Sequence, residues 1–230
     1  MIAIRGLSLA AGEHGLDSLS LEVADGEIVF LLHRSEGWGE PLFRCLSGAA
    51  RADAGEVLFD GAPAGERRNG LSAAFIDRVA DAGDFETEAR LGDWIDLLCA
   101  AGGAERAGIY RTLLVLSFHE GQLRRKVRDL RPEAFQQVYL AACLAPERRN
   151  VVINDFIRGA GKGFELKFNK LLLQQKDQGR AVLGLGSDIF SASEVADRVG
   201  FVKEGRLLFE AASSDLKEMD LKDLYRKFLN

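Results

Sequence analysis

The order of hydrophobic and polar positions predicts strands and helices that alternate along most of the chain. Apolar residues alternate with polar ones at 2–4 and 19–23, which is typical of strands with one buried face. The run at 27–32 is apolar after its first residue, as in a strand buried on both sides. Further strands are expected at 55–61, 151–153 and 181–185, and a hairpin is expected around Glu204 and Gly205. This order predicts an α/β fold whose mixed sheet has parallel central strands.

Helical spacing of apolar residues fills most of the remaining chain. Pro41 and Gly48 bracket a short helix, because proline suits a first turn and glycine follows a last one. Other helices are expected within 86–130, from Pro132 to Pro146, at 168–176 and at 216–229. We therefore expect one domain over 1–230, with an α/β core at 1–85 and 145–215, an inserted helical subdomain at 86–144 and a C-terminal helix at 216–230.

Composition narrows the class of protein. The chain has 230 residues, of which 47% are hydrophobic and 28% charged, and a net charge of −5, so a full core is expected and nucleic-acid binding is not. The three cysteines lie far apart and are expected to be reduced thiols. A leader and an apolar run of about 18 residues are both absent, which favours a cytoplasmic chain that does not itself cross a membrane.

Short segments spread over nearly the whole chain resemble one known family. They stand in the family's order at 4–8, 19–23, 26–29, 42–48, 55–61, 179–182 and 202–207. Together they resemble the ATP-binding cassette, the nucleotide-binding domain of ABC transporters. The resemblance implies the ABC ATPase variant of the P-loop NTPase fold, with a helical subdomain inserted in the α/β core.

The phosphate-binding loop departs from the family's pattern. That pattern, GxxxxGK[ST], lets backbone N–H groups surround phosphate, while lysine supplies charge and a hydroxyl binds Mg²⁺. The resemblance places Gly39 where the lysine belongs and Glu40 where the hydroxyl belongs, with Glu36 and Trp38 at small-glycine positions. His33 opens the stretch, and Pro41 removes one N–H donor. We therefore expect a degenerate loop in which the Glu40 carboxylate occupies the helix N-terminus that phosphate would use.

The positions that bind Mg²⁺ and orient the attacking water in the family also differ in this chain. The resemblance places Asn154 at the Mg²⁺-binding aspartate, Asp155 at the catalytic glutamate and Ser187 at the switch histidine. An amide is a weaker Mg²⁺ ligand than a carboxylate, and serine cannot act as a base near neutral pH. No catalytic residue and no metal site are therefore predicted, and the three dispersed histidines do not suggest one.

Two further segments bear on partners. At the family's LSGGQ signature the chain has Arg131, Pro132 and Glu133, and the proline and glutamate are unsuited to a phosphate. The resemblance places Arg78 near the glutamine that couples metal to the membrane subunit. Phe85 and Trp94 lie where the family receives a permease helix, so these three are the predicted partner interface, although Phe85 and Trp94 are equally suited to a core.

The sequence thus predicts a non-catalytic cassette subunit that docks a membrane permease, pairs with an intact ATPase subunit, or does both. No cofactor is expected, and ATP with Mg²⁺ is expected to bind weakly at most. We also expect a dimer that associates with the membrane through its partner. One alternative is a regulatory cassette that binds ATP through Arg34 or Lys162 without efficient hydrolysis. Another is a stand-alone scaffold. The tail resembles exporter-type cassettes, although the direction of transport and the substrate stay open.

Overall fold

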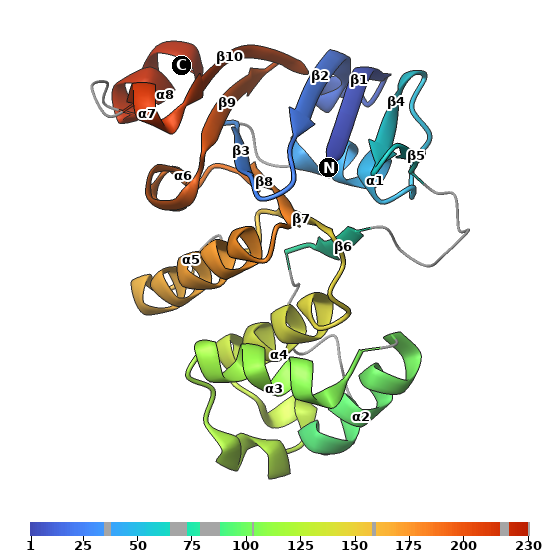
Figure 1. The fold of residues 1–230 in the computed structure, drawn as a ribbon, viewed down its shortest axis with the longest axis vertical. Coiled ribbons are helices and arrows are strands. Elements are labelled where there is room, and N and C mark those ends of the chain that lie inside the picture. The colour runs from blue at the N-terminus through green and yellow to red at the C-terminus, as the bar shows by residue number, and fades with distance from the viewer. Residues whose placement is uncertain are drawn as a thin grey trace.

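A computed structural model describes residues 1–34, 38–64, 73–78, 88–102, 104–157, 160–216 and 221–229. Its centre is a six-stranded sheet with the order β10-β9-β3-β8-β7-β6 (Figure 1). The strands are β3 (Ile28–Leu32), β6 (Ala73–Ile76), β7 (Asn150–Asn154), β8 (Ala181–Gly186), β9 (Arg198–Lys203) and β10 (Arg206–Ala212). All neighbours are parallel except β9 and β10. The predicted mixed sheet with parallel central strands is confirmed.

The three central strands are buried along their whole length. Every residue of β3, β7 and β8 is buried, which agrees with their nearly continuous apolar sequences. The edge hairpin between β9 and β10 forms where Glu204 and Gly205 predicted it. Gly205 has φ +79°, and a Cβ there would lie 2.3 Å from the Gly15 carbonyl oxygen, so this turn requires glycine.

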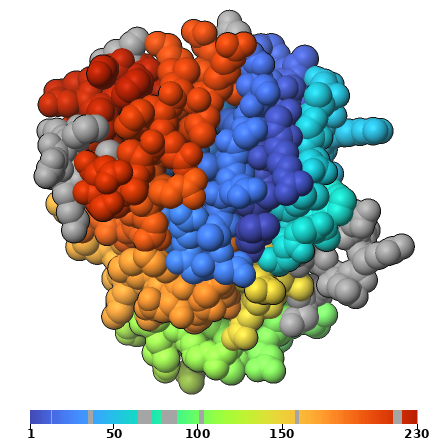
Figure 2. All heavy atoms as spheres, turned by 45° about the horizontal axis from the view of Figure 1, so that its top comes forward, coloured from blue at the N-terminus to red at the C-terminus, as the bar shows by residue number. Residues whose placement is uncertain are grey.

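A second, antiparallel sheet has the order β2-β1-β4-β5. Its strands are β1 (Ile2–Leu9), β2 (Leu16–Val23), β4 (Ala54–Phe59) and β5 (Ala62–Pro63), and the short helix η1 (Gly12–His14) joins the first two. Helix α1 (Gly39–Leu46) lies with this sheet on one face of the central sheet, and their apolar side chains form one continuous core. Figure 2 shows β2 beside β10 on one surface, where Arg206 Nε donates to Asp17 Oδ2 at 2.7 Å.

The opposite face of the central sheet is covered by helices. They are α5 (Lys162–Asp177), α6 (Ile189–Val195) and α8 (Leu221–Leu229), with α7 (Ser213–Leu216) after β10. Helix α5 begins at Lys162, before the expected residue 168, and Phe164 in its first turn is already buried in the core. Strand β6 and helix α6 were not anticipated, because each is short and carries little periodic signal.

A group of helices lies beyond the β6–β7 edge of the sheet (Figure 1). It contains α2 (Leu91–Gly102), α3 (Arg106–Val115) and α4 (Pro132–Leu144), with η3 (Glu120–Arg124) and η4 (Val127–Asp129) between the last two. These helices share an apolar core of their own, built around Ile95, Ile109 and Phe135. In the described part of the chain, the helices fall short of the length and hydropathy that a membrane span needs.

Helix α6 depends on a side-chain cap. Asp188 accepts hydrogen bonds from the backbone N–H groups of Phe190 at 3.1 Å and Ser191 at 3.3 Å. Asp188→Ala is expected to lower the free energy of unfolding by about 1 kcal/mol, because these N–H groups lose their acceptor. Asp188→Asn, which keeps an acceptor, should stay close to the original protein. Urea unfolding of both variants tests this, and equal midpoints for the two would contradict it.

Candidate functional site

The candidate site lies where the central strands end. The carboxyl ends of β3, β7 and β8 meet at one edge, the usual ligand position in open parallel sheets. His33 N donates to the Gly186 carbonyl at 3.1 Å, and Asp155 N donates to the Leu185 carbonyl at 2.9 Å. These bonds bring together three predicted stretches: His33 after β3, Asn154 and Asp155 at the end of β7, and Ser187 after β8.

Gly39 and Asn154 are packed against each other at this edge. A Cβ on Gly39 would lie 2.4 Å from Asn154 Oδ1 and 3.5 Å from His33 Nε2. Asn154 is only 6% exposed, and its Nδ2 donates to Asp77 Oδ1 at 2.9 Å. Asp77 follows β6 and was not singled out from the sequence. A side chain at position 39 therefore requires Asn154 to move away from a bonded position.

The rings of His33 and Trp38 lie together at the start of α1. Their centroids are 5.3 Å apart with planes inclined by 50°, and both residues are buried. Trp38 Nε1 is buried and, among the described residues, has no hydrogen-bond partner. Glu36, also predicted to belong to this loop, lies outside the described residues.

The first turn of α1 carries Glu40 and Pro41, as the sequence predicted. Glu40 is exposed, and its carboxylate stands at the positive end of the helix dipole, where a negative charge is favourable. Pro41 is half-buried and brings no N–H group to this turn. The helix N-terminus is thus supplied with negative charge by the chain itself.

A cavity of about 210 Å³ adjoins the ends of β7 and β8. Phe30, Phe156 and Phe168 form much of its wall, and Asp155 and Ser187 reach it. Glu165 and Asp188 add two more carboxyl groups, while the described residues of its lining include neither lysine nor arginine. The described residues contain no group of three or more His, Cys, Asp or Glu side chains placed to hold a metal ion.

Asp155 has a left-handed backbone conformation and lies against β8. Its φ is +44°, in the left-handed region, and its Oδ1 would be 2.7 Å from a Cβ at Gly186. A longer side chain at position 155 would therefore press against Gly186 of β8. Asp155 is therefore packed against β8 at the strand ends.

Tyr225 is a neighbour of the site that the sequence did not reveal. Its hydroxyl donates to the His33 carbonyl at 3.3 Å. Burial raises the pKa of Tyr225, while the Arg34 guanidinium lowers it and the Asp155 carboxylate raises it, so both charges act on the phenol. The two partners are 192 positions apart in sequence, which explains why no local pattern links them.

The signature positions and the predicted partner interface lie elsewhere. Arg131, Pro132 and Glu133 form the exposed start of α4. Arg78 is exposed after β6, and Trp94 is half-buried with its ring 5.6 Å from that of Phe135. Phe85 lies outside the described residues. Trp94 thus contributes to the core of the helical group, which is the alternative that the sequence had left open for it.

The two cations considered as replacements for the missing lysine are placed differently. Arg34 is exposed directly after His33, at the strand ends. Lys162 begins α5, and its ammonium lies 5.4 Å from the centroid of the Phe190 ring. Arg34 is therefore the cation that belongs to this edge, whereas Lys162 contacts α6.

Tyr139 and Cys143 of α4 pack against the apolar core of the central sheet. The Tyr139 ring stacks on Phe156 at 6.1 Å, and burial raises the pKa of the Cys143 thiol to about 11. We expect alkylation of Cys143 at pH 8 to be about 100-fold slower in the folded protein than after denaturation, since little thiolate is present. The rate should rise with pH up to about 11. Timed iodoacetamide labelling with peptide mass spectrometry measures this, and equal rates in both states would contradict it.

Comparisons with known proteins agree with this architecture. A ribose import ATP-binding protein, RbsA 1 of Streptomyces coelicolor, is 31% identical over 213 residues, covering 87% of this chain and 42% of that protein. The arabinose import ATP-binding protein AraG of Burkholderia pseudomallei is 26% identical over 234 residues, covering 94% and 45%. The chain thus spans less than half the length of these relatives. No family model matches it.

Solved structures show the same fold. The structure of an ATP-binding subunit of an ABC transporter has a TM-score of 0.79, with 18% identity and 99% coverage of both chains. The ADP conformation of an ATP-binding cassette of an ABC transporter has a TM-score of 0.76, with 15% identity and coverage of 97% and 96%. The chain is therefore a homologue of the ATP-binding subunits of ABC transporters and has the fold of an ABC ATPase domain.

Proposed function

We propose that this chain is a cassette subunit of an ABC transport system that does not hydrolyse ATP. The observation that carries the proposal is the packing of Asn154 against Gly39. By resemblance, the lysine and the Mg²⁺-binding carboxylate of an active cassette belong at these two positions. Here one has no side chain, and the other is a neutral amide bonded to Asp77.

Electrostatics supports the same conclusion. A triphosphate at this edge would meet the carboxyl groups of Glu40, Asp155, Glu165 and Asp188. Among the described residues, Arg34 is the cation that the strand ends offer against these charges. At an effective dielectric constant of about 20, two unit charges about 4 Å apart interact by about 4 kcal/mol. Hydrolysis needs cations at the phosphates to offset the charge that develops there. The described residues at positions 33–41 and 154–155 thus do not fit ATP and Mg²⁺.

The proposed role is structural within a transporter. We infer that the chain docks a membrane permease, pairs with an intact ATPase subunit, or does both, and reaches the inner face of the membrane through that partner. The retained fold and the names of the relatives support this. Those names favour import, whereas the tail of the sequence resembles exporter-type cassettes. We propose that the permease selects the substrate.

A hydrolysis assay tests the catalytic half of the proposal. The purified chain with Mg²⁺ and ATP should release phosphate no faster than a protein-free blank, and Asp155→Ala should make no difference. Glu40→Ala, which removes a repelling charge, is the matched variant and should also stay at the blank. Steady turnover by the unmodified chain that Asp155→Ala abolishes would refute the proposal.

The partner half needs a separate experiment. Affinity purification of the full-length protein from its own cells, followed by mass spectrometry, should recover a recognisable permease or a second cassette. Recovery should fall when the binding surface is changed, for which Arg78→Glu is a suitable variant, because Arg78 is exposed. If neither kind of protein is recovered under mild detergent, the partner role fails while the catalytic claim is unaffected.

A second candidate is a regulatory cassette that binds ATP without efficient hydrolysis. The exposed Arg34 favours it, since this cation stands at the strand ends and acts on Tyr225 beside Asp155. Titration calorimetry with Mg-ATP separates the two candidates. Saturable binding that Arg34→Ala weakens and Lys162→Ala leaves unchanged would favour regulation over the proposal above.

A further inference from the structure

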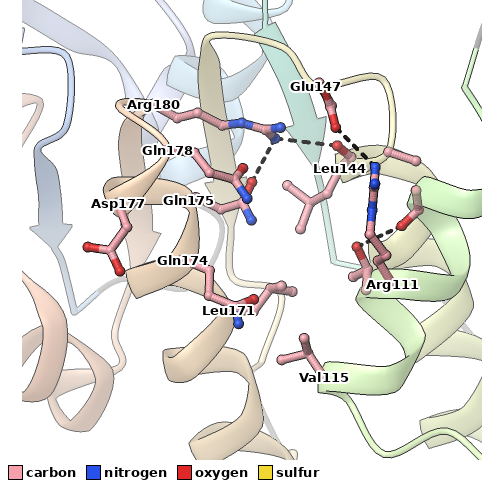
Figure 3. A pocket seen from close by; sticks show the side chains of 13 residues that line it. Arg111, Val115, Leu144, Glu147, Leu171, Gln174, Gln175, Asp177, Gln178 and Arg180 are labelled. Atoms are coloured by element: carbon pink, nitrogen blue, oxygen red, sulfur yellow. Dashed lines mark hydrogen bonds and ion pairs between the residues drawn. The ribbon is translucent and has the colours of Figure 1, made fainter.

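A groove of about 400 Å³ lies between the helical group and α5, away from the strand ends described above. One wall comes from α3 and the end of α4, and the other comes from the last turns of α5 and the segment that leads into β8 (Figure 3). Its volume lies within the range of small-molecule sites in proteins. The groove thus has the size of a ligand site and is bounded by both parts of the molecule.

The groove contains a buried arginine. Arg180 is 7% exposed, and its guanidinium extends across the groove towards the end of α4 (Figure 3). Nη1 donates to Gln175 Oε1 at 2.6 Å and to the Leu144 carbonyl at 3.4 Å. Both acceptors are neutral. The remaining guanidinium nitrogens, Nε and Nη2, have no hydrogen bond to the described residues.

This cation lacks a carboxylate partner in the described part of the chain. Two acidic residues line the groove, but neither forms an ion pair with Arg180. Glu147 is bonded by Arg111 Nη2 at 3.3 Å, and Asp177 is exposed. Burial lowers the pKa of Arg180 and the more distant Glu147 carboxylate raises it, and arginine stays charged in proteins. Buried charges are normally paired, so a guanidinium that is open to a groove calls for an anion from outside.

We propose that the groove binds a small organic monocarboxylate, with its carboxylate on Arg180. A guanidinium offers two parallel N–H donors that match a carboxylate. The neighbouring Glu147 and Asp177 disfavour ligands of higher charge, such as phosphate. Leu144 lies beside Arg180 in the groove (Figure 3) and suits a short carbon chain, while Gln174 and Gln178 supply amides at its side. This proposal does not depend on whether the chain hydrolyses ATP.

Calorimetric titration of the intact chain tests the proposal with three probes: acetate, butyrate and inorganic phosphate. Butyrate is expected to bind at one site and more tightly than acetate, because its longer carbon chain covers more of the apolar lining of the groove. Phosphate is expected to bind more weakly than either carboxylate. Absence of saturable carboxylate binding, or tighter binding of phosphate, would overturn the proposal.

Two variants locate the site. Arg180→Gln should weaken butyrate binding by about 30-fold or more, since the charged partner is lost. Arg180 also donates to the end of α4. The circular dichroism spectrum of Arg180→Gln is therefore compared with that of the original chain, and the two should be equal. Gln178→Glu adds a charge at the exposed rim and should weaken binding about two- to fivefold. Ser214→Glu adds the same charge on α7 and should have no effect, and equal effects of these last two variants would overturn the assignment.

Discussion

Gly39→Lys is expected to lower the free energy of unfolding by about 3 kcal/mol, the cost of overpacking a filled site, and to create no ATPase activity. The reason is the 2.4 Å approach of a Cβ at this position to Asn154 Oδ1. Moving Asn154 aside also breaks its bond to Asp77. Urea unfolding gives the stability change, and a phosphate-release assay gives the activity.

Two controls separate packing from the general effect of replacing glycine. Gly39→Ala should be destabilising in the same way, whereas Gly161→Ala should be nearly neutral, because a Cβ there meets nothing within 4 Å. In a double-mutant cycle, Gly39→Ala and Asn154→Ala should be coupled by about 1 kcal/mol or more, as expected for residues in contact. Additive effects, or a stable Gly39→Lys variant that hydrolyses ATP, would show that the Gly39–Asn154 packing is not the obstacle.

Phe156→Ala is expected to have the largest effect on stability, about 3–5 kcal/mol, as for large aromatic residues removed from cores. Phe156 is 2% exposed and directly follows Asp155. Its ring lies 5.7 Å from that of Phe168 and 6.2 Å from that of Phe164 on α5, and it stacks on Tyr139 of α4. It therefore joins the strand ends, α5 and the helical group in one cluster.

The matched control is Phe118→Ala. Phe118 is half-buried against the core of the helical group, so its loss should cost clearly less than the loss of Phe156. Chemical unfolding followed by circular dichroism and by tryptophan fluorescence measures both variants. A loss below about 1 kcal/mol for Phe156→Ala would mean that the core refills the space and that the cluster does not tie these elements together.

The elements predicted correctly from the sequence are those with strong local signals. Strand β3 is apolar from end to end because both of its faces are buried, and the β9–β10 turn carries the glycine that its positive φ requires. Strand β6 and helix α6 escaped prediction for the opposite reason. Their few residues acquire order from neighbours distant in the chain, such as β7 for strand β6.

The candidate site was partly predictable. The positions of His33, Asn154, Asp155 and Ser187 followed from the family resemblance, and the strand ends do bring them together. Asp77 and Tyr225 could not be found, because their contacts with Asn154 and His33 depend on the packing of β6 and α8. The closeness of Gly39 to Asn154 likewise exists only in three dimensions. The assignments of Glu36 and Phe85 stay predictions, since both lie outside the described residues.

The most direct test of the central claim is a crystal structure of the chain grown with ATP and Mg²⁺ in excess. We predict that Asn154 keeps its place against Gly39 and its bond to Asp77, and that no triphosphate is seated at the start of α1. An ordered triphosphate with Mg²⁺ between residues 33 and 41, accompanied by displacement of Asn154, would contradict the account.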